Sequence, residues 1–274
     1  MSSKLWGNDP SKTDVIRQVT DNITTVSVPF LRFGLIKFGG RATIAKLSSG
    51  GLVVFSPTVL TDEVSSTVTS LGGQVSYLVA PDIEHHLNLA AWKAAYPSAR
   101  VIGPSVLYEK RKKQGNEDVP FDFSYTPANK NTMVLPEDFT NDFDIEYWDG
   151  HMAHDISLLH KPSGTFIEAD LLFNLPSKEQ FSKSDIDANA GFFTKLSLSL
   201  FTSLAGKSQQ RFIWYGLSKG KASFNASSKK VDGWEFDRII PCHGDVIETG
   251  GKATFRRLFA WHIAAAEADA KKSK

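Results

Sequence analysis

The chain has 274 residues, of which 41% are hydrophobic and 22% are charged. This balance is typical of a globular protein built as one large domain or two fused halves, and it excludes a disordered or fibrous chain. The 31 basic and 30 acidic side chains nearly cancel. The net charge therefore gives no general attraction for nucleic acid or for an anionic membrane surface.

Cysteine content and hydropathy bear on the compartment. Cys242 is the single cysteine, so no internal disulfide can form, as is usual in a reducing compartment. Residues 1–13 lack the apolar core of a secretory signal, and no run of about 18 apolar residues occurs. We therefore expect a cytoplasmic protein without a membrane span. Residues 271–274 are expected to form a basic tail.

The first hundred residues predict a sheet that continues into alternating helices and strands. Alternating β-branched residues and short apolar runs predict strands over 22–28, 42–47, 51–55, 75–80 and 100–104. Helix-like spacing of apolar residues predicts helices over 60–71 and 87–96. Because a strand, a helix and a strand follow one another, we expect a parallel pair of strands with a right-handed crossover.

The second half begins with a segment that has no clear period. Residues 114–142 are rich in Asn, Asp, Pro and Phe, and we expect an irregular segment or an inserted hairpin there. Strands are predicted over 156–160 and 165–169, joined by a turn at residues 161–164. The remaining predicted elements are an apolar helix over 192–204, a strand over 238–241 and an amphipathic helix over 252–270. This order of elements indicates the α/β class.

Several histidines and one aspartate directly follow predicted strands. His85 and His86 follow the strand over 75–80, Asp170 ends the strand over 165–169, and His243 follows the strand over 238–241. Loops at the carboxyl ends of strands are where α/β sheets place ligands. Neutral imidazoles that meet a carboxylate suit a borderline-soft divalent ion such as zinc, at roughly 2.0 Å from nitrogen.

Four segments together resemble the metallo-β-lactamase-like superfamily. The segment Val79–His86 stands where that family has His-X-His-X-Asp-His, and Gly150-His151 resembles the Gly-His of its third motif. Ile167–Asp170 resembles the strand that ends on a metal-bridging Asp, and Pro241–Gly244 resembles the final Pro-Gly-His-Gly. The resemblance covers residues 22–262. It implies a four-layer αββα sandwich, with one domain over residues 22–270 after an N-terminal extension of residues 1–21.

The departures from the family pattern change the expected metal site. Pro81 and Ile83 stand where the family has two histidines of its first zinc site, and neither can ligate. The chain thus resembles a divergent branch in which Pro-X-X-X-His-His replaces the usual histidine motif. The resemblance then implies a reduced site for a single ion. Its candidate ligands are His85, His86, Asp170 and His243, with His151 at the edge.

The resemblance also implies a cofactor and a reaction. The expected cofactor is one zinc ion, with iron, manganese or a metal-free protein as alternatives. Bound zinc lowers the pKa of water to about 7, so hydroxide is present at neutral pH. The implied activity is hydrolysis of a small organic ester, lactone or amide. In that reaction Asp170 would orient the water, and Glu84 or Asp82 would accept a proton.

The sequence also allows a function other than hydrolysis. Because Pro81 and Ile83 remove two ligands, the chain is alternatively a fold relative that has lost catalysis and binds a small molecule or a partner. The sequence contains no Gly-X-Ser-X-Gly segment, which argues against a serine hydrolase of the usual kind. No nucleic-acid partner is expected, and a homodimer is left open.

Structural roles are the simpler interpretation for several residues. His85 and His86 could open a helix, with one ring capping its backbone, and Asp170 could cap a turn. The helix over 192–204 is expected to pack in the core, with a dimer contact or a pocket wall as alternatives. Structural roles are also expected for His154, His160 and His262, for a buried Cys242, and for residues 110–113 as a solvated helix face.

Overall fold

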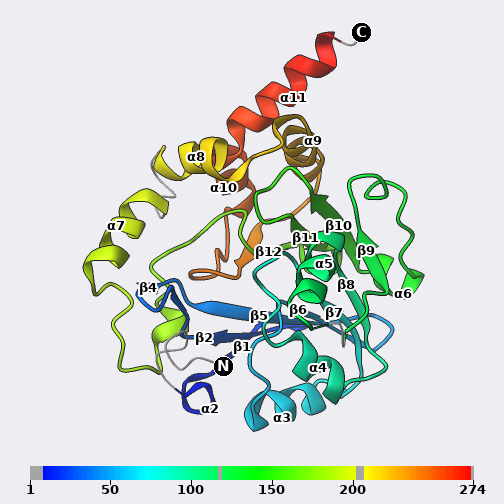
Figure 1. The fold of residues 1–274 in the computed structure, drawn as a ribbon, viewed down its shortest axis with the longest axis vertical. Coiled ribbons are helices and arrows are strands. Elements are labelled where there is room, and N and C mark those ends of the chain that lie inside the picture. The colour runs from blue at the N-terminus through cyan, green and yellow to red at the C-terminus, as the bar shows by residue number, and fades with distance from the viewer. Residues whose placement is uncertain (1–8, 117–118, 202–206, 273–274) are drawn as a thin grey trace.

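A computed structural model describes residues 9–116, 119–201 and 207–272. Two β-sheets pack face to face in it, and helices cover the outer face of each sheet (Figure 1). None of the described helices could span a bilayer, because none combines the necessary length with a sufficiently apolar sequence.

The larger sheet has seven strands in the order β1-β2-β5-β6-β7-β8-β9. The first four strands pair antiparallel, whereas the pairs from β6 to β9 are parallel. Its strands are β1 (Val15–Thr20), β2 (Ile23–Val28), β5 (Gly40–Lys46), β6 (Leu52–Phe55), β7 (Val75–Val79), β8 (Arg100–Pro104) and β9 (Phe123–Tyr125). The parallel pair expected from the strand, helix, strand order is confirmed in β7 and β8.

The smaller sheet has four strands in the order β10-β11-β12-β13. The strands are β10 (Phe143–Trp148), β11 (Asp155–His160), β12 (Thr165–Glu168) and β13 (Arg238–Pro241). The turn predicted between residues 161 and 164 joins β11 to β12, and Gly164 adopts a positive φ of 55° there. A short hairpin of β3 (Leu31–Arg32) and β4 (Ile36–Lys37) lies outside both sheets.

Helices and short helical turns connect the strands. Between strands of the larger sheet lie α3 (Asp62–Ser70), α4 (Leu89–Ala95) and α5 (Ser105–Lys113). Around the smaller sheet lie α8 (Ser208–Phe212), the π-helix η3 (Ile213–Leu217), α9 (Lys221–Asp232), α10 (Gly251–Leu258) and α11 (Ala260–Lys272). The remaining elements are α2 (Pro10–Thr13), α6 (Glu137–Thr140), α7 (Phe192–Phe201), η1 (Lys161–Ser163) and η2 (Glu179–Phe181).

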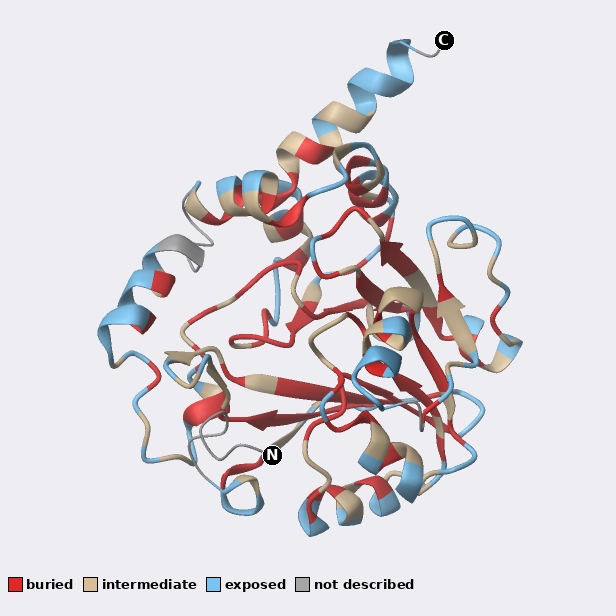
Figure 2. Cartoon of the chain, in the orientation of Figure 1, coloured by how far each residue is buried: buried red, intermediate tan, exposed pale blue. Residues whose placement is uncertain are grey.

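Alternation along each strand builds three apolar layers. In β6, Val53 and Phe55 face the layer between the sheets, whereas Leu52 and Val54 face the layer under α3 and α4. This follows from the two-residue period of a strand. The third layer packs the smaller sheet against α8, α9 and α10. Figure 2 shows buried residues along both sheets and exposed ones on the outer sides of the helices. The expected four-layer αββα sandwich is therefore confirmed.

Two local expectations about the fold need correction. The larger sheet begins at Val15, because β1 pairs with β2 inside the segment expected to be an extension. The described part of residues 114–142 is mostly irregular, which was one of the two alternatives expected, and its strand β9 joins the edge of the larger sheet. The closing helix is two helices, because the chain breaks at Phe259, whose buried ring stacks on Phe255 at a centroid distance of 4.3 Å.

The apolar helix α7 also differs from expectation. Phe192, Phe193 and Leu196 are exposed, with 75%, 53% and 48% of their surface accessible. Thr194 is buried instead, and its hydroxyl accepts a hydrogen bond from the Lys37 N–H of β4. The helix therefore does not pack most of its large apolar side chains in the core. Residues 202–204, the predicted end of this helix, lie outside the described residues.

Candidate metal centre

The candidate ligands come from three strands that end at one edge of the sandwich. His85 lies in the loop that follows β7 of the larger sheet. Asp170 follows β12 and His243 follows β13, both in the smaller sheet. Because the carboxyl ends of these strands open on the same crevice, residues far apart in the chain meet there.

His85, Asp170 and His243 form a compact group. The ligand atoms that they offer all lie within 4.8 Å of one another. The Nε2 atoms of His85 and His243 are 3.1 Å apart, and His243 Nε2 lies 3.3 Å from Asp170 Oδ1. Ligands at zinc distances of about 2.0–2.1 Å in a tetrahedron stand about 3.3 Å from each other. The spacing of the two measured pairs therefore fits one ion.

Hydrogen bonds at Nδ1 fix the tautomers of both histidines. His85 Nδ1 lies 2.8 Å from Asp82 Oδ2, and His243 Nδ1 lies 2.7 Å from the Gly39 carbonyl oxygen. Both partners only accept hydrogen bonds, so each Nδ1 carries a proton. In a neutral ring the lone pair is then on Nε2, and the two Nε2 lone pairs face each other. Two lone pairs at this distance repel unless a proton or a metal ion lies between them. The donor set therefore fits a divalent cation.

The charges around the group also favour a cation. Burial alone would lower the pKa of His85, but the carboxylates of Asp82 and Asp170 outweigh burial and raise that pKa to about 9. Burial would raise the pKa of Asp170, but His85 and His243 hold it below its ordinary value. Positive charge is thus stabilised between these side chains.

Two fully buried acids hold the loop that carries Asp170. Asp155 accepts a hydrogen bond from the Asp170 N–H at 2.8 Å, and Glu168 accepts one from the Leu171 N–H at 2.8 Å. Burial, together with neighbouring carboxylates, raises the pKa of Asp155 and of Glu168 well above the ordinary values. Their backbone contacts fix the position from which the Asp170 carboxylate projects.

The loop that carries His243 is held from the larger sheet. The fully buried guanidinium of Arg41 donates to the carbonyls of Pro241 and Gly244 at 2.6 Å each. Gly244 has a φ of 97°, and a Cβ there would lie 2.2 Å from the Asn174 backbone, so only glycine fits this turn. The rings of Phe30, Phe38 and Phe173 lie around the imidazole, with centroids 5.5 to 6.3 Å away.

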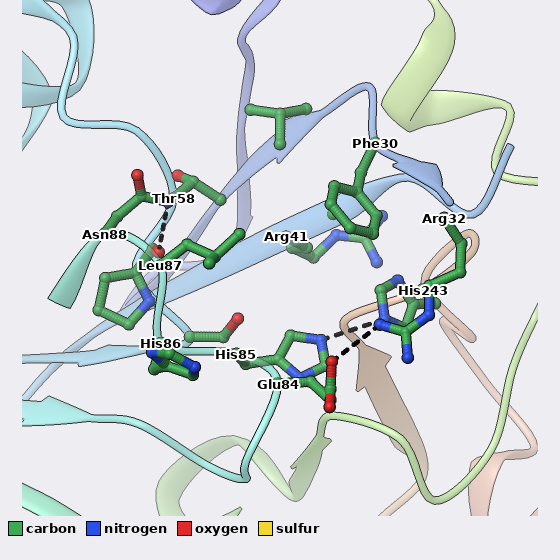
Figure 3. A pocket seen from close by; sticks show the side chains of 14 residues that line it. Phe30, Arg32, Arg41, Thr58, Glu84, His85, His86, Leu87, Asn88 and His243 are labelled. Atoms are coloured by element: carbon green, nitrogen blue, oxygen red, sulfur yellow. Dashed lines mark hydrogen bonds and ion pairs between the residues drawn. The ribbon is translucent and has the colours of Figure 1, made fainter. Parts of the chain in front are cut away.

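Two pockets open beside the group. One, of about 60 Å³, is lined by His85, His86 and Arg41 among others and is drawn in Figure 3. The other, of about 170 Å³, is lined by His151, Asp170 and several apolar side chains. Arg32, Glu84 and His243 line both pockets. The Arg32 guanidinium and the Glu84 carboxylate pair at 3.0 Å (Figure 3), so this ion pair stands between the two spaces.

The structure does not bring His86 to the other candidate ligands. Its ring turns away from His85 (Figure 3), and its Nδ1 lies 3.3 Å from Nη1 of the buried Arg111. Burial and the cations Lys110 and Arg111 lower the pKa of His86 to about 4. Adjacent residues in this tight loop point to opposite sides, so only His85 reaches Asp170 and His243. The expectation that both imidazoles converge is corrected accordingly.

The two acids considered as proton acceptors have different surroundings. Asp82 is fully buried, and both of its oxygens accept hydrogen bonds, one from His85 Nδ1 and the other from the N–H groups of Glu84 and His85. It therefore positions His85. Glu84 is partly exposed and pairs with Arg32 at 3.0 Å and with Lys110 at 3.4 Å.

His151 lies at the edge of the group, in the larger of the two pockets. It is buried, and burial lowers its pKa to about 4, so the ring is neutral at pH 7. Its side chain is outside the compact set formed by His85, Asp170 and His243. The sequence resemblance placed it among five candidate ligands, and the structure gathers three of those five.

The other histidines and the cysteine have structural surroundings. His160 contacts the Ser163 hydroxyl at 2.7 Å, and His262 contacts the Asn225 side-chain oxygen at 2.6 Å inside an aromatic cluster. His154 contacts the Tyr147 hydroxyl at 3.2 Å. Cys242 is buried, and burial raises the pKa of its thiol. The structural roles expected for these four residues are compatible with these contacts.

The basic run at residues 110–113 is only partly a solvated face. Lys110 donates to the Ile83 carbonyl at 2.5 Å as well as pairing with Glu84, and Arg111 is 3% exposed. Both cations therefore hold the loop that carries His85, because α5 packs directly against it. This role, like that of Arg41, was missed from sequence because a basic residue gives no signal of burial by itself.

Removing the Asp82 carboxylate tests the positioning of His85. Asp82→Asn keeps the size of the side chain but removes the charge that orients the imidazole, and we expect zinc affinity to fall roughly 10- to 100-fold. Asp142→Asn is the matched control, because Asp142 is also buried but contacts Ser48. Competition with a chromophoric chelator measures both affinities. Equal zinc affinity of Asp82→Asn and the wild type would remove Asp82 from this role.

Comparison with solved structures places this architecture in a known class. The chain is similar to the VMB-1 protein, with a TM-score of 0.58 and 10% identity over 93% of this chain and 99% of that one. It is also similar to a metallo-β-lactamase from Pontibacter korlensis, with a TM-score of 0.55 and 10% identity over 90% and 99%. A third similar structure is the Flv1 flavodiiron core from Synechocystis sp. PCC6803, with a TM-score of 0.62 and 12% identity over 92% of this chain and 61% of that one. At these identities the likeness shows the metallo-β-lactamase fold alone.

Sequence comparison identifies the family. The model of the family described as "Domain of unknown function (DUF4336)" matches residues 34–193, which is more than half of the chain. This protein therefore belongs to that family. No curated protein matches the sequence significantly. The matched region contains His85 and Asp170, whereas His243 lies beyond it.

Proposed function

We propose that this protein is a metal-dependent hydrolase of a small organic ester, lactone or amide. One observation carries the proposal: His243 Nε2 stands at the spacing of ligands around one ion from both His85 Nε2 and an oxygen of Asp170, and all three ligand atoms lie within 4.8 Å of one another. We further propose that the sandwich, with β1 included, acts as one domain around this site, and that Pro81–His86 marks a divergent branch of the metallo-β-lactamase-like superfamily.

Zinc is the ion that we propose, because two imidazoles and one carboxylate form a donor set typical of catalytic zinc. Iron and manganese accept the same donors. When bound, such an ion lowers the pKa of water so that hydroxide is available at neutral pH. Asp170 is the residue that we propose to orient that water. Glu84 is the proposed proton acceptor, because it lines both pockets beside the three candidate ligands.

The larger pocket suggests the kind of substrate. Its walls include Phe38, Ile83, Met152, Phe173, Phe212 and Leu217, and its volume is about 170 Å³. Arg32 is the single cationic side chain among its described lining residues apart from histidines, and it is already paired with Glu84. An uncharged acyl group of modest size therefore suits this space better than an anion does.

Metal content and hydrolysis measured together test the proposal. Protein purified without tags or chelators and then loaded with zinc is expected to hold about one equivalent. A panel of uncharged esters, lactones and amides is then assayed with loaded, chelator-treated and reloaded protein. Turnover should disappear with the metal and return with it. Loading of less than about a tenth of an equivalent under saturating zinc would refute the proposal.

A second function has one observation in its favour. Pro81 and Ile83 fill the place of two metal ligands in the resembled family, and the Ile83 side chain lines the larger pocket. A protein that binds a small apolar molecule without converting it would use the same pocket. Under that function, Asp170→Asn should leave binding of a small uncharged compound intact, as calorimetry would measure. Loss of that binding in the variant would argue against it.

A further inference from the structure

The ring of His151 is held in one tautomer by the backbone. His151 follows β10, and its own N–H donates to the Trp148 carbonyl at 2.9 Å. Its Nδ1 accepts a hydrogen bond from the Ala153 N–H at 3.2 Å. A backbone amide can only donate, so Nδ1 carries the lone pair and the ring proton of the neutral imidazole must reside on Nε2.

The Nε2–H group of His151 is a buried donor without a well-placed acceptor. His151 is 1% exposed, and within the described residues no partner meets hydrogen-bond geometry at Nε2. An interaction with the Asp170 backbone favours a proton on the ring, but its geometry is too poor to satisfy Nε2. A buried polar group left unpaired destabilises the fold. Because His151 also lines the larger pocket, a molecule bound there could supply the missing acceptor.

This tautomer does not suit His151 for metal binding. A ligating imidazole needs a free lone pair, but the lone pair at Nδ1 is used by Ala153 and Nε2 carries hydrogen. Two further ligands that would share an ion with it are replaced by Pro81 and Ile83. His151 nevertheless lines the larger pocket together with Asp170 and His243. His151 therefore lies beside the group of candidate ligands but is not suited to bind the ion itself.

We propose that His151 Nε2–H binds the carbonyl oxygen of an uncharged acyl substrate and stabilises the negative charge that develops there. This inference rests on the proposed hydrolase function. The apolar part of the substrate would lie against Met152, Phe212 and Leu217, which line the same pocket. A single polar donor in an apolar wall selects a neutral carbonyl compound, because a charged group would lose its hydration without compensation.

The reaction step that this donor assists is balanced. The hydroxide oxygen forms a bond to the acyl carbon, and the electron pair of the C=O double bond moves onto the carbonyl oxygen. His151 donates a hydrogen bond to that oxygen and keeps its proton. The electron pair then returns, the bond to the alcohol or amine leaving group breaks, and the leaving group takes the proton that was released from water. Removing one such donor typically lowers kcat about 10²- to 10³-fold.

Paired substitutions separate a donor from a ligand. His151→Leu removes the donor, and we expect kcat to fall about 100-fold or more with KM changed by less than about threefold. His151→Gln can donate through its amide and should recover part of kcat. Zinc content should stay near one equivalent in both variants, with circular dichroism to verify folding. Loss of the ion in His151→Leu, or unchanged kcat, would overturn the inference.

A spectroscopic test avoids dependence on turnover. In metal-free protein, long-range ¹H–¹⁵N spectra should show His151 as the Nε2–H tautomer, and hexanamide, a neutral carbonyl probe, should shift that resonance. Wild-type protein that binds zinc and shows this shift but hydrolyses none of the compounds would refute the proposed function without removing the carbonyl subsite. An Nδ1–H tautomer, or no response to hexanamide, would refute the subsite whatever the activity.

Discussion

Asp170→Asn is expected to leave less than about a tenth of an equivalent of zinc and to lower hydrolysis at least about 1,000-fold. Asn keeps the shape of the side chain but cannot offer the anionic oxygen that stands 3.3 Å from His243 Nε2. Two histidines alone are one ligand short of the three that catalytic zinc sites commonly use. Elemental analysis and the ester panel measure the two effects.

The control for this substitution is Asp187→Asn. Asp187 is exposed, and its carboxylate accepts hydrogen bonds from the neighbouring Asn189, so zinc content and turnover should match the wild type. Urea unfolding of both variants shows whether any loss comes from instability of the fold. Full zinc occupancy in a folded Asp170→Asn protein would contradict the assignment of Asp170 as a ligand.

The metal-free protein is expected to lose stability as the pH rises from 6.5 to 9. The pKa of His85 is raised from 6.5 to about 9 in the folded state, so the folded protein holds a proton that the unfolded chain releases. The contribution of this proton to the free energy of unfolding is full below pH 6.5 and is lost as the pH rises through 9. The loss is up to about 3 kcal/mol. The raised pKa values of Asp155 and Glu168 also make stability fall with rising pH, and this loss begins at the ordinary carboxyl pKa of about 4.

Urea unfolding at pH 6.5 and pH 9 measures this loss. His85→Gln should show a smaller loss than the wild type, because the group that titrates is gone. Zinc added at pH 9 should restore stability, since the ion takes the place of the proton between the two rings. Identical unfolding curves of the wild type at the two pH values would show that His85 does not hold that proton.

Much of the fold could be predicted from local sequence patterns. Strands such as Val75–Val79 and Arg238–Pro241 are apolar runs bounded by turn residues, and they were placed within one or two residues. The strand β10 (Phe143–Trp148) was missed although its apolar and polar residues alternate as in a half-buried strand. The break at Phe259 was missed because the helical period of apolar residues continues across it, and the ring of Phe259 stacks on Phe255 and Phe224.

Part of the candidate site could also be predicted from local sequence patterns. His85, Asp170 and His243 each follow a strand, so their convergence could be inferred from strand ends together with the family resemblance. The direction of each side chain could not be inferred. His86 is adjacent to His85 in sequence, yet its ring contacts Arg111 across the loop. That contact depends on how α5 packs, which no local pattern encodes.

The amino-acid sequence specifies which chemical groups this protein has and which strand ends carry them. Pro81 and Ile83 cannot ligate, so imidazoles and a carboxylate remain as possible ligands. Which of those groups face one another follows from the folded structure, because it depends on sheet packing and on buried hydrogen bonds. The Ala153 N–H sets the tautomer of His151, and Asp82 sets that of His85. Such contacts, rather than residue types, separate a ligand from a hydrogen-bond donor.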